Sequence, residues 1–368
     1  AMEFSDTVST ISPSIAGEMA GNLALINPDL SADISISMIA ANPESSGLIA
    51  AEVIDILPVA ASADMIQQIQ LNDPNAAMQF ANTAAENSPE LAGRMIEEII
   101  NENNEFALEL STSMSNANSD SLKPITLAIV NSSPESMADF ILNTSSENDF
   151  NSEIIINTLL EDNSNEFVKI VSDIGNENLN FAGQFYSQID ILAPETATNI
   201  SNEIALSNLD FAGEMALAVA QENPESASKI AISASKVDIG QADSLLVEMS
   251  MLNPKAGADF INELVGNDLL NTEEISGTIS EQFMFSADQN NIDIANQLSS
   301  DLMQIDSNIG GNLVSSIAAT SISQMNELIN SQEGNSDLNA TSIIQNNLNF
   351  VQTQLNSGMF ADSISQDQ

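Results

Sequence analysis

Cysteine and histidine, two residue types that carry much of enzyme chemistry, are absent from this sequence. Their absence excludes disulfide frameworks, thiol nucleophiles, histidine-based catalytic triads, and the zinc and haem sites built on these residues. A glycine-rich phosphate loop is also missing, because Gly310-Gly311 is not followed by a lysine and a hydroxyl residue. Paired carboxylates such as Glu97-Glu98 and Glu273-Glu274 remain, but neighbouring residues on a helix point in different directions and are typical of a solvated surface. We therefore expect no enzymatic activity and no cofactor.

Basic residues are scarce: the chain has six Lys and Arg against 53 Asp and Glu, a formal net charge of −47. None of the six lies before Arg94 or after Lys255. Most of the chain therefore cannot neutralise phosphates, so nucleic acid and anionic membrane surfaces are poor partners. No run of about 18 apolar residues is present, which predicts no membrane insertion. The few cleavage sites after Lys or Arg suit exposure to proteases, which favours an extracellular or cell-surface location.

What the sequence does contain is a proline lattice with a period of 15 residues. Ten of the eleven prolines fall on it, with one extra residue inserted between the fourth and the fifth. These structural-repeat prolines are Pro13, Pro28, Pro43, Pro58, Pro74, Pro89, Pro134, Pro194, Pro224 and Pro254. Asn, Asp or Ser precedes fifteen of the seventeen lattice positions between residues 13 and 254; Leu57 and Ala193 are the exceptions. A side-chain oxygen followed by proline is typical of a helix N-terminus, so each repeat is predicted to begin a helix.

Apolar residues recur six and ten residues after the lattice positions, as Ile34 and Met38 do after Pro28. A small residue, usually alanine, stands three residues after them. These offsets share one face of a helix, so each repeat is predicted to be one amphipathic helix of about three turns. Because few residues are left between helices, successive helices should run antiparallel and pair as 30-residue hairpins. The predicted fold class is all-α: an α-solenoid of 15-residue single-helix repeats with a less regular helical C-terminal cap.

The pattern divides the chain into five parts. Residues 1–4 are interpreted as a vector-derived extension, and residues 5–265 as the regular α-solenoid with seventeen helical repeats. Residues 266–290 are interpreted as an irregular insertion, residues 291–361 as degenerate repeats or a capping helical bundle, and residues 362–368 as a frayed tail. Pro124 lies off the lattice and predicts either a kink or a late helix start near Lys123.

Calcium is the one ligand that the sequence suggests, with Asn72, Asp73 and Asn75 as candidate ligands. Asn and Asp oxygens suit calcium, but no EF-hand pattern is present and these residues stand where a helix cap is expected. Self-assembly is a further hypothesis, in which an apolar set in the C-terminal region either makes contacts between chains or is buried among its own helices. That set is Val314, Ile317, Ile322, Met325 and Leu328.

Three functions are compatible with these observations. The first is a non-enzymatic structural repeat segment of a larger secreted or cell-surface protein, which acts as an elongated spacer, scaffold or adhesive module. The second is an acidic α-solenoid that binds a basic protein or peptide on its concave face, which requires acids clustered on one face. The third is a surface protein that binds divalent cations such as calcium.

Overall fold

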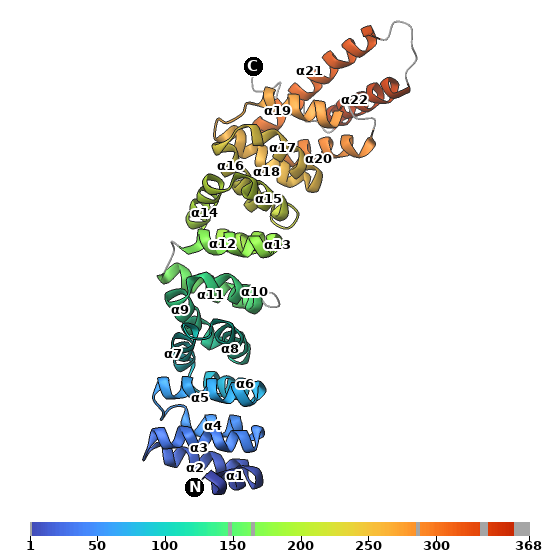
Figure 1. Cartoon of the computed structure of the whole chain (residues 1–368). Coiled ribbons are helices and arrows are strands. Elements are labelled where there is room, and N and C mark those ends of the chain that lie inside the picture. Colours follow the sequence, from blue (N-terminus) through green and yellow to red (C-terminus); the bar gives the residue numbers. More distant parts are fainter. Residues whose placement is uncertain (1, 146–148, 163–165, 285–287, 332–337, 357–368) are drawn as a thin grey trace. The chain divides into compact units, whose positions relative to one another are not determined.

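A computed structural model describes residues 2–145, 149–162, 166–284, 288–331 and 338–356 of the chain (Figure 1). These residues form α-helices with short 3₁₀ and π turns, and the described ranges contain no strand. The all-α prediction is therefore confirmed for the described part. The chain divides into two compact units, Ala1–Ile174 and Gly175–Gln368.

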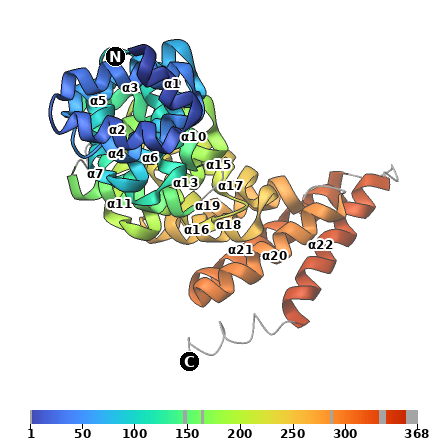
Figure 2. The ribbon, with the colours of Figure 1, turned by 90° about the horizontal axis from the view of Figure 1, so that it is seen from below.

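The first unit is built from helices that pack on their second neighbours. Its helices are α1 (Met2–Ile11), α2 (Pro13–Ala24), α3 (Pro28–Ala41), α4 (Ser46–Val53), α5 (Val59–Asn72), α6 (Pro74–Asn87), α7 (Pro89–Ile100), α8 (Asn104–Ala117), α9 (Leu122–Ser132), α10 (Met137–Ser145) and α11 (Asp149–Asp162). Helix α1 contacts α3, α2 contacts α4, and the same relation continues without a break to α9 and α11. Most helices also contact the next one along the chain. Figure 2 shows α1, α3 and α5 in one row and α2, α4 and α6 in a second.

The second unit repeats this packing. After α12 (Phe167–Glu177), which carries the boundary between the units, come α13 (Leu179–Leu192), α14 (Pro194–Ser207), α15 (Leu209–Val219), α16 (Pro224–Val237), α17 (Gly240–Leu252), α18 (Pro254–Gly266), α19 (Thr272–Ile279), α20 (Gln289–Ile305), α21 (Ser307–Ser331) and α22 (Leu338–Asn356). Contacts between second neighbours run from α13 and α15 through to α20 and α22. The same packing rule therefore extends past the last lattice proline, Pro254.

Lattice prolines start helices as predicted, with local variations. Seven of the ten occupy the first position of an α-helix: Pro13, Pro28, Pro74, Pro89, Pro194, Pro224 and Pro254. Pro43 and Pro134 open 3₁₀ turns, η1 (Pro43–Ser45) and η3 (Pro134–Ser136), which lead into α4 and α10. The fixed φ of proline and its missing N–H suit the first turn of either helix type.

Pro58 departs from the predicted position. It lies before the first residue of α5, with φ −56° and ψ 144°, so the helix begins one residue later at Val59. The preceding residue, Leu57, is buried and has no oxygen with which to cap a helix. The one-residue insertion between Pro58 and Pro74 therefore lies at the start of α5. The buried residues of this repeat lie one position later than in the others, at Met65 and Ile69.

Pro124 lies in the first turn of a helix that begins late, and not in a helix interior. The 3₁₀ turn η2 (Ser119–Ser121) opens this repeat, and α9 begins at Leu122, which places Pro124 in its first turn. In the first turn the backbone N–H groups have no partner within the helix, so proline removes no hydrogen bond there.

The two apolar offsets of the lattice form the core of both units. The side chains six and ten residues after each lattice position from 28 onward are buried, and in the Pro58 repeat the buried pair lies one residue later. The first repeat is the exception, because Met19 and Leu23 are half-buried.

Helices two apart run parallel and come into close contact through glycine. Gly17 of α2 faces Leu48 of α4, and Gly21 faces Glu52, so both helices progress in the same direction. A Cβ atom at Gly17 would lie 2.7 Å from Leu48 O, and one at Gly93 of α7 would lie 2.5 Å from Pro124 O of α9. Only glycine lets the backbones approach this closely.

The C-terminal helices vary more in length than the lattice helices. Helix α19 begins with a capping box formed by Asn271 and Glu274, and a π-helical turn (Ser280–Met284) follows it. Helices α21 and α22 are longer than the 14-residue lattice helices such as α3, with 25 and 19 residues. The predicted tail, residues 362–368, lies outside the described residues.

Candidate functional site

The sequence-predicted calcium ligands lie where α5 ends and α6 begins. One oxygen of the Asp73 carboxylate accepts hydrogen bonds from the backbone N–H of Asn75 at 2.9 Å and of Ala76 at 3.1 Å, so it caps α6. The Asn72 amide donates to the backbone oxygen of Gln68 at 3.1 Å. In the described residues, no group of three or more Asp and Glu side chains is placed to hold a metal ion. Calcium binding by Asn72, Asp73 and Asn75 stays a prediction.

Three asparagine caps, Asn42, Asn118 and Asn253, also connect neighbouring repeats. Asn118 Oδ1 accepts from the backbone N–H of Asp120 at 3.0 Å, and its Nδ2 donates to the backbone oxygen of Ala85, near the end of α6, at 2.8 Å. Asn42 makes the same bond to Ser9 O at 2.8 Å, and Asn253 makes it to Ala220 O at 3.0 Å. Each bond spans 33 residues. One side chain thus caps the following helix and ties the ends of two parallel helices.

Serine at the same place behaves differently. Ser12 and Ser88 make no side-chain capping hydrogen bond, and the Ser133 hydroxyl donates to Glu135 at 2.8 Å. This carboxylate also accepts a backbone hydrogen bond, and the two bonds together lower the pKa of Glu135 below its ordinary value. The position before the lattice residue therefore holds asparagines and serines that make different contacts, and the sequence pattern does not separate them.

A cluster of charged and polar side chains joins α13 to α16 in the second unit. Lys229 Nζ lies 2.9 Å and 3.0 Å from the two carboxylate oxygens of Asp190 and 3.2 Å from Glu225. The Asp190 carboxylate, only 5% exposed, also accepts from the Ser226 hydroxyl at 2.7 Å. Burial lowers the pKa of Lys229, but its hydrogen bonds to Asp190 and Glu225 outweigh burial and raise the pKa overall. These contacts pair the charges of Lys229 and Asp190 and connect α16 to α13, so we interpret the cluster as structural.

Two further polar side chains, Tyr186 and Arg94, do not belong to this cluster. Tyr186 of α13 is fully buried, and burial raises its pKa. Its ring therefore belongs to the core between helices. Arg94 borders a small surface pocket of about 170 Å³, together with Glu90 and Glu97 of its own helix and Asn131 of α9. One arginine between two glutamates leaves this pocket with a negative balance, which disfavours anions.

The proposed self-assembly residues are split by the structure. Val314 and Ile317 of α21 are buried, whereas Ile322 is 48% exposed. The side chains of Met325 and Leu328 lie outside the described residues. Burial among the helices, one of the two alternatives for this set, therefore holds for the first two members.

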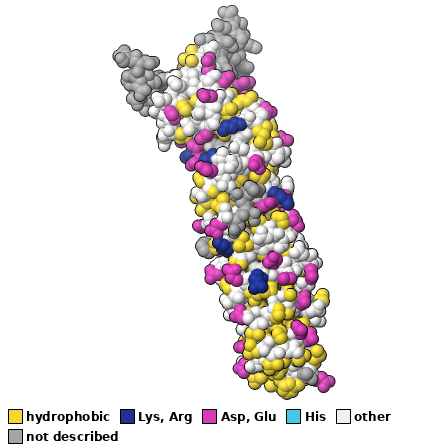
Figure 3. Space-filling view, turned by 90° about the vertical axis from the view of Figure 1, so that its left-hand side faces the viewer, with side chains coloured by type: hydrophobic (Ala, Val, Ile, Leu, Met, Phe, Trp, Pro, Cys, Tyr) yellow, Lys and Arg dark blue, Asp and Glu magenta, His cyan; other side chains and the backbone are white. Residues whose placement is uncertain are grey.

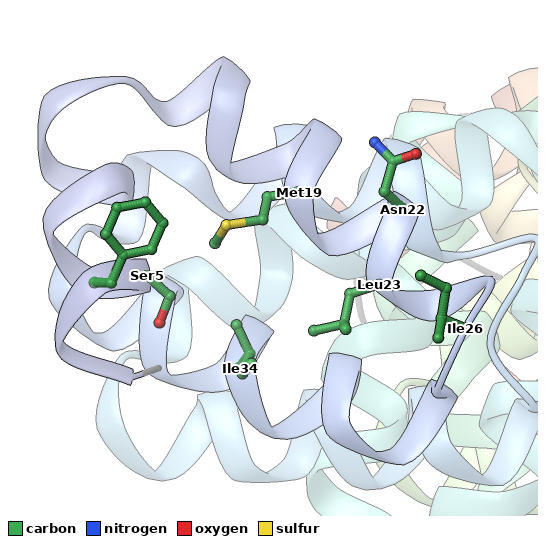
Figure 4. Close-up of a pocket in the computed structure, with 7 residues that line it drawn as sticks. Ser5, Met19, Asn22, Leu23, Ile26 and Ile34 are labelled. Carbon is green, nitrogen blue, oxygen red and sulfur yellow. The ribbon is translucent and has the colours of Figure 1, made fainter.

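An open apolar groove of about 330 Å³ is formed by α1, α2 and α3 in the first unit. Its lining residues are Phe4 and Ser5 of α1, Met19, Asn22 and Leu23 of α2, Ile26 after α2, and Ile34 of α3. Figure 4 shows Met19, Leu23 and Ile34 directed towards a shared space. Phe4 and Ile26 at its rim are 67% and 81% exposed. We call these seven residues the N-terminal groove.

Sequence reasoning did not single out this groove. Met19 and Leu23 stand at the same lattice offsets as the core residues of every later repeat except the Pro58 repeat, so the pattern predicts them to be core residues. The sequence pattern predicts which side chains face a neighbouring helix. Whether a helix covers them is known only from the structure.

Acidic side chains do not gather in one place on the face that Figure 3 shows. On this face they are scattered, with isolated Lys and Arg side chains among them. In the described residues, no helix combines the length and the apolar character needed to cross a membrane. No family model, no curated protein and no solved structure matches this chain.

Proposed function

We propose that this chain is a non-enzymatic structural segment: an α-solenoid that acts as an elongated spacer, scaffold or adhesive module of a larger secreted or cell-surface protein. The observation that carries the proposal is the packing of helices on their second neighbours, which continues without a break from α1 to α11 and from α13 to α22. In a solenoid each repeat contacts only its neighbours, so its length grows with the number of repeats. Such an architecture suits a segment that sets the distance between other domains of a protein.

The cross-repeat bonds support the same proposal. Asn42, Asn118 and Asn253 each connect to a backbone oxygen 33 residues earlier, and Gly17 and Gly93 each admit the backbone of the second neighbour. A contact that recurs at a fixed sequence distance belongs to a one-dimensional stack. A net charge of −47 keeps such segments apart in solution, since like charges repel. On the face that Figure 3 shows, the acids are scattered rather than clustered as a basic partner would favour, so we place that hypothesis second.

Deleting one two-helix unit tests the proposal. Removing residues 74–103 joins Asp73 to Asn104, which leaves a capping residue in front of a helix start and preserves the lattice phase. A solenoid refolds around this deletion with unchanged helicity per residue, and its maximum dimension in small-angle X-ray scattering falls by about 10 Å, the spacing of packed helices.

The matched control removes 22 residues, 74–95, and so breaks the lattice phase. This variant should lose helicity and cooperative unfolding, because its apolar offsets no longer face the core. If both deletions behave alike, or if the in-phase deletion folds without becoming shorter, the solenoid proposal is wrong.

A further inference from the structure

Helix α22 packs on the second unit through a face that is largely polar. Among its side chains that the structure describes, the buried ones are Asn347, Phe350 and Gln354. Spacings of three and four residues place them on one face of the helix. The lattice helix α18 differs, because its buried residues carry no polar side chain and include Phe260 and Leu264. Two of the three buried side chains of α22 are amides, so this helix is held in a different way from the repeats before it.

Asn347 connects α22 to the π-helical turn Ser280–Met284. Its Nδ2 donates to Met284 O at 2.9 Å, across 63 residues, and to Ile343 O of its own helix at 2.8 Å. Met284 is the last residue of the turn, and backbone oxygens at the end of a helix lack partners within it. A second amide bond runs to α20, where Gln354 Nε2 donates to Asn296 Oδ1 at 2.9 Å. These two bonds fix the position of α22 along its own axis.

The same interface contains buried polar atoms that lack a hydrogen bond. Asn347 Oδ1 and Ser280 Oγ, the second of them in the π-helical turn, have no hydrogen-bond partner among the described residues. A buried polar atom without a partner has lost its bonds to water and gained none in return. A polar side chain at a core position selects one register and lowers stability. Helix α22 is therefore placed specifically and held weakly.

We propose that α22 is a reversible strap. Asn347 holds it in one register on the π-helical turn, and the helix leaves this site as a unit while the lattice helices of the second unit stay folded. Elements that bury little apolar surface open before the whole fold does. In the closed state α22 shields Met284 O and its own Phe350, and in the open state both are accessible to solvent.

Hydrogen–deuterium exchange of the unmodified full chain, read by mass spectrometry, measures the opening directly. Peptides from α22 should be protected relative to an unfolded peptide, yet exchange about 100-fold faster than peptides from α18 of the same unit. Protection equal to that of α18 would overturn the proposal, because α22 would then open only with the whole fold. Complete lack of protection would contradict it as well, because no closed state would exist.

The same exchange at two positions of α22 tests the role of Asn347. Asn347→Ala removes the bond to Met284 O, so exchange of α22 peptides should become about tenfold faster while α18 is unaffected. Asn349→Ala is the matched control. This asparagine is exposed on the same helix, its side chain bonds to Gln345 of that helix, and the change in helix propensity is the same. Equal acceleration in both variants would show that Asn347 does not hold the strap.

Fluorescence follows the strap in a second way, since the chain has no tryptophan. Phe350→Trp places a single reporter in α22, and Phe260→Trp places one in α18; both phenylalanines are fully buried. In urea, the emission of the α22 reporter should shift to longer wavelength before helicity falls, whereas the α18 reporter should shift together with helicity. Coincident transitions for both reporters would contradict separate opening of α22.

Discussion

Asparagine does more at the helix starts than a capping rule requires. The rule asks for one acceptor oxygen, which Asp, Asn and Ser all supply. Asn118 also uses its amide as a donor to Ala85 O, and only an amide combines both functions in one side chain. The sequence pattern predicted the cap because the cap is local. It did not predict the second bond, whose acceptor lies 33 residues away and depends on how two parallel helices align.

Exchanging the capping residue separates the two functions. Asn118→Asp keeps the acceptor oxygen, loses the donor, and places a carboxylate beside the carbonyl end of α6; we expect a loss of about 1–2 kcal/mol in unfolding free energy. Asp73→Asn is the reverse exchange at a cap for α6, and it should change stability by less than about 0.5 kcal/mol. Urea unfolding followed by circular dichroism measures both. Equal shifts would mean that the bond to Ala85 O adds nothing.

At the scale of the helix, the lattice predicted where most elements begin, with a few local departures. Helix α5 begins one residue late, at Val59, and α9 begins at Leu122, which leaves Pro124 in a first turn where proline is tolerated. The apolar offsets predicted the core correctly, since a helical face is a property of sequence spacing. Close contact at Gly17 and Gly93 was beyond prediction, because it depends on the distance between second neighbours.

Two glycine substitutions with the same propensity gain should have opposite outcomes. Alanine favours a helix over glycine by about 1 kcal/mol. At Gly93 the new Cβ would lie 2.5 Å from Pro124 O, so Gly93→Ala should destabilise the chain by about 1–3 kcal/mol as α7 and α9 separate. At Gly277 of α19 nothing lies within 4 Å of such a Cβ, so Gly277→Ala should stabilise by about 0.5–1 kcal/mol. Thermal unfolding compares them, and a stabilising Gly93→Ala would refute the close contact between α7 and α9.

At the scale of the whole chain, charge opposes folding more than any single ion pair supports it. A net charge of −47 favours expanded states, whereas the ion pairs in the described residues involve only Lys123, Lys229 and Lys255. The Debye length shortens from about 10 Å at 0.1 M salt to about 3 Å at 1 M, so added salt weakens repulsion between exposed carboxylates. The melting temperature should therefore rise with salt concentration.

The identity of the cation distinguishes screening from a specific site. Because Asp73 already uses one carboxylate oxygen to cap α6, we expect calcium chloride at about 1 mM to raise the melting temperature no more than sodium chloride at matched ionic strength. Differential scanning calorimetry on the full chain makes this comparison. A calcium shift of several degrees above the sodium curve, abolished by Asp73→Asn, would instead establish the site at Asn72, Asp73 and Asn75. A calcium-specific shift that Asp73→Asn leaves unchanged would place the ion elsewhere on the acidic surface.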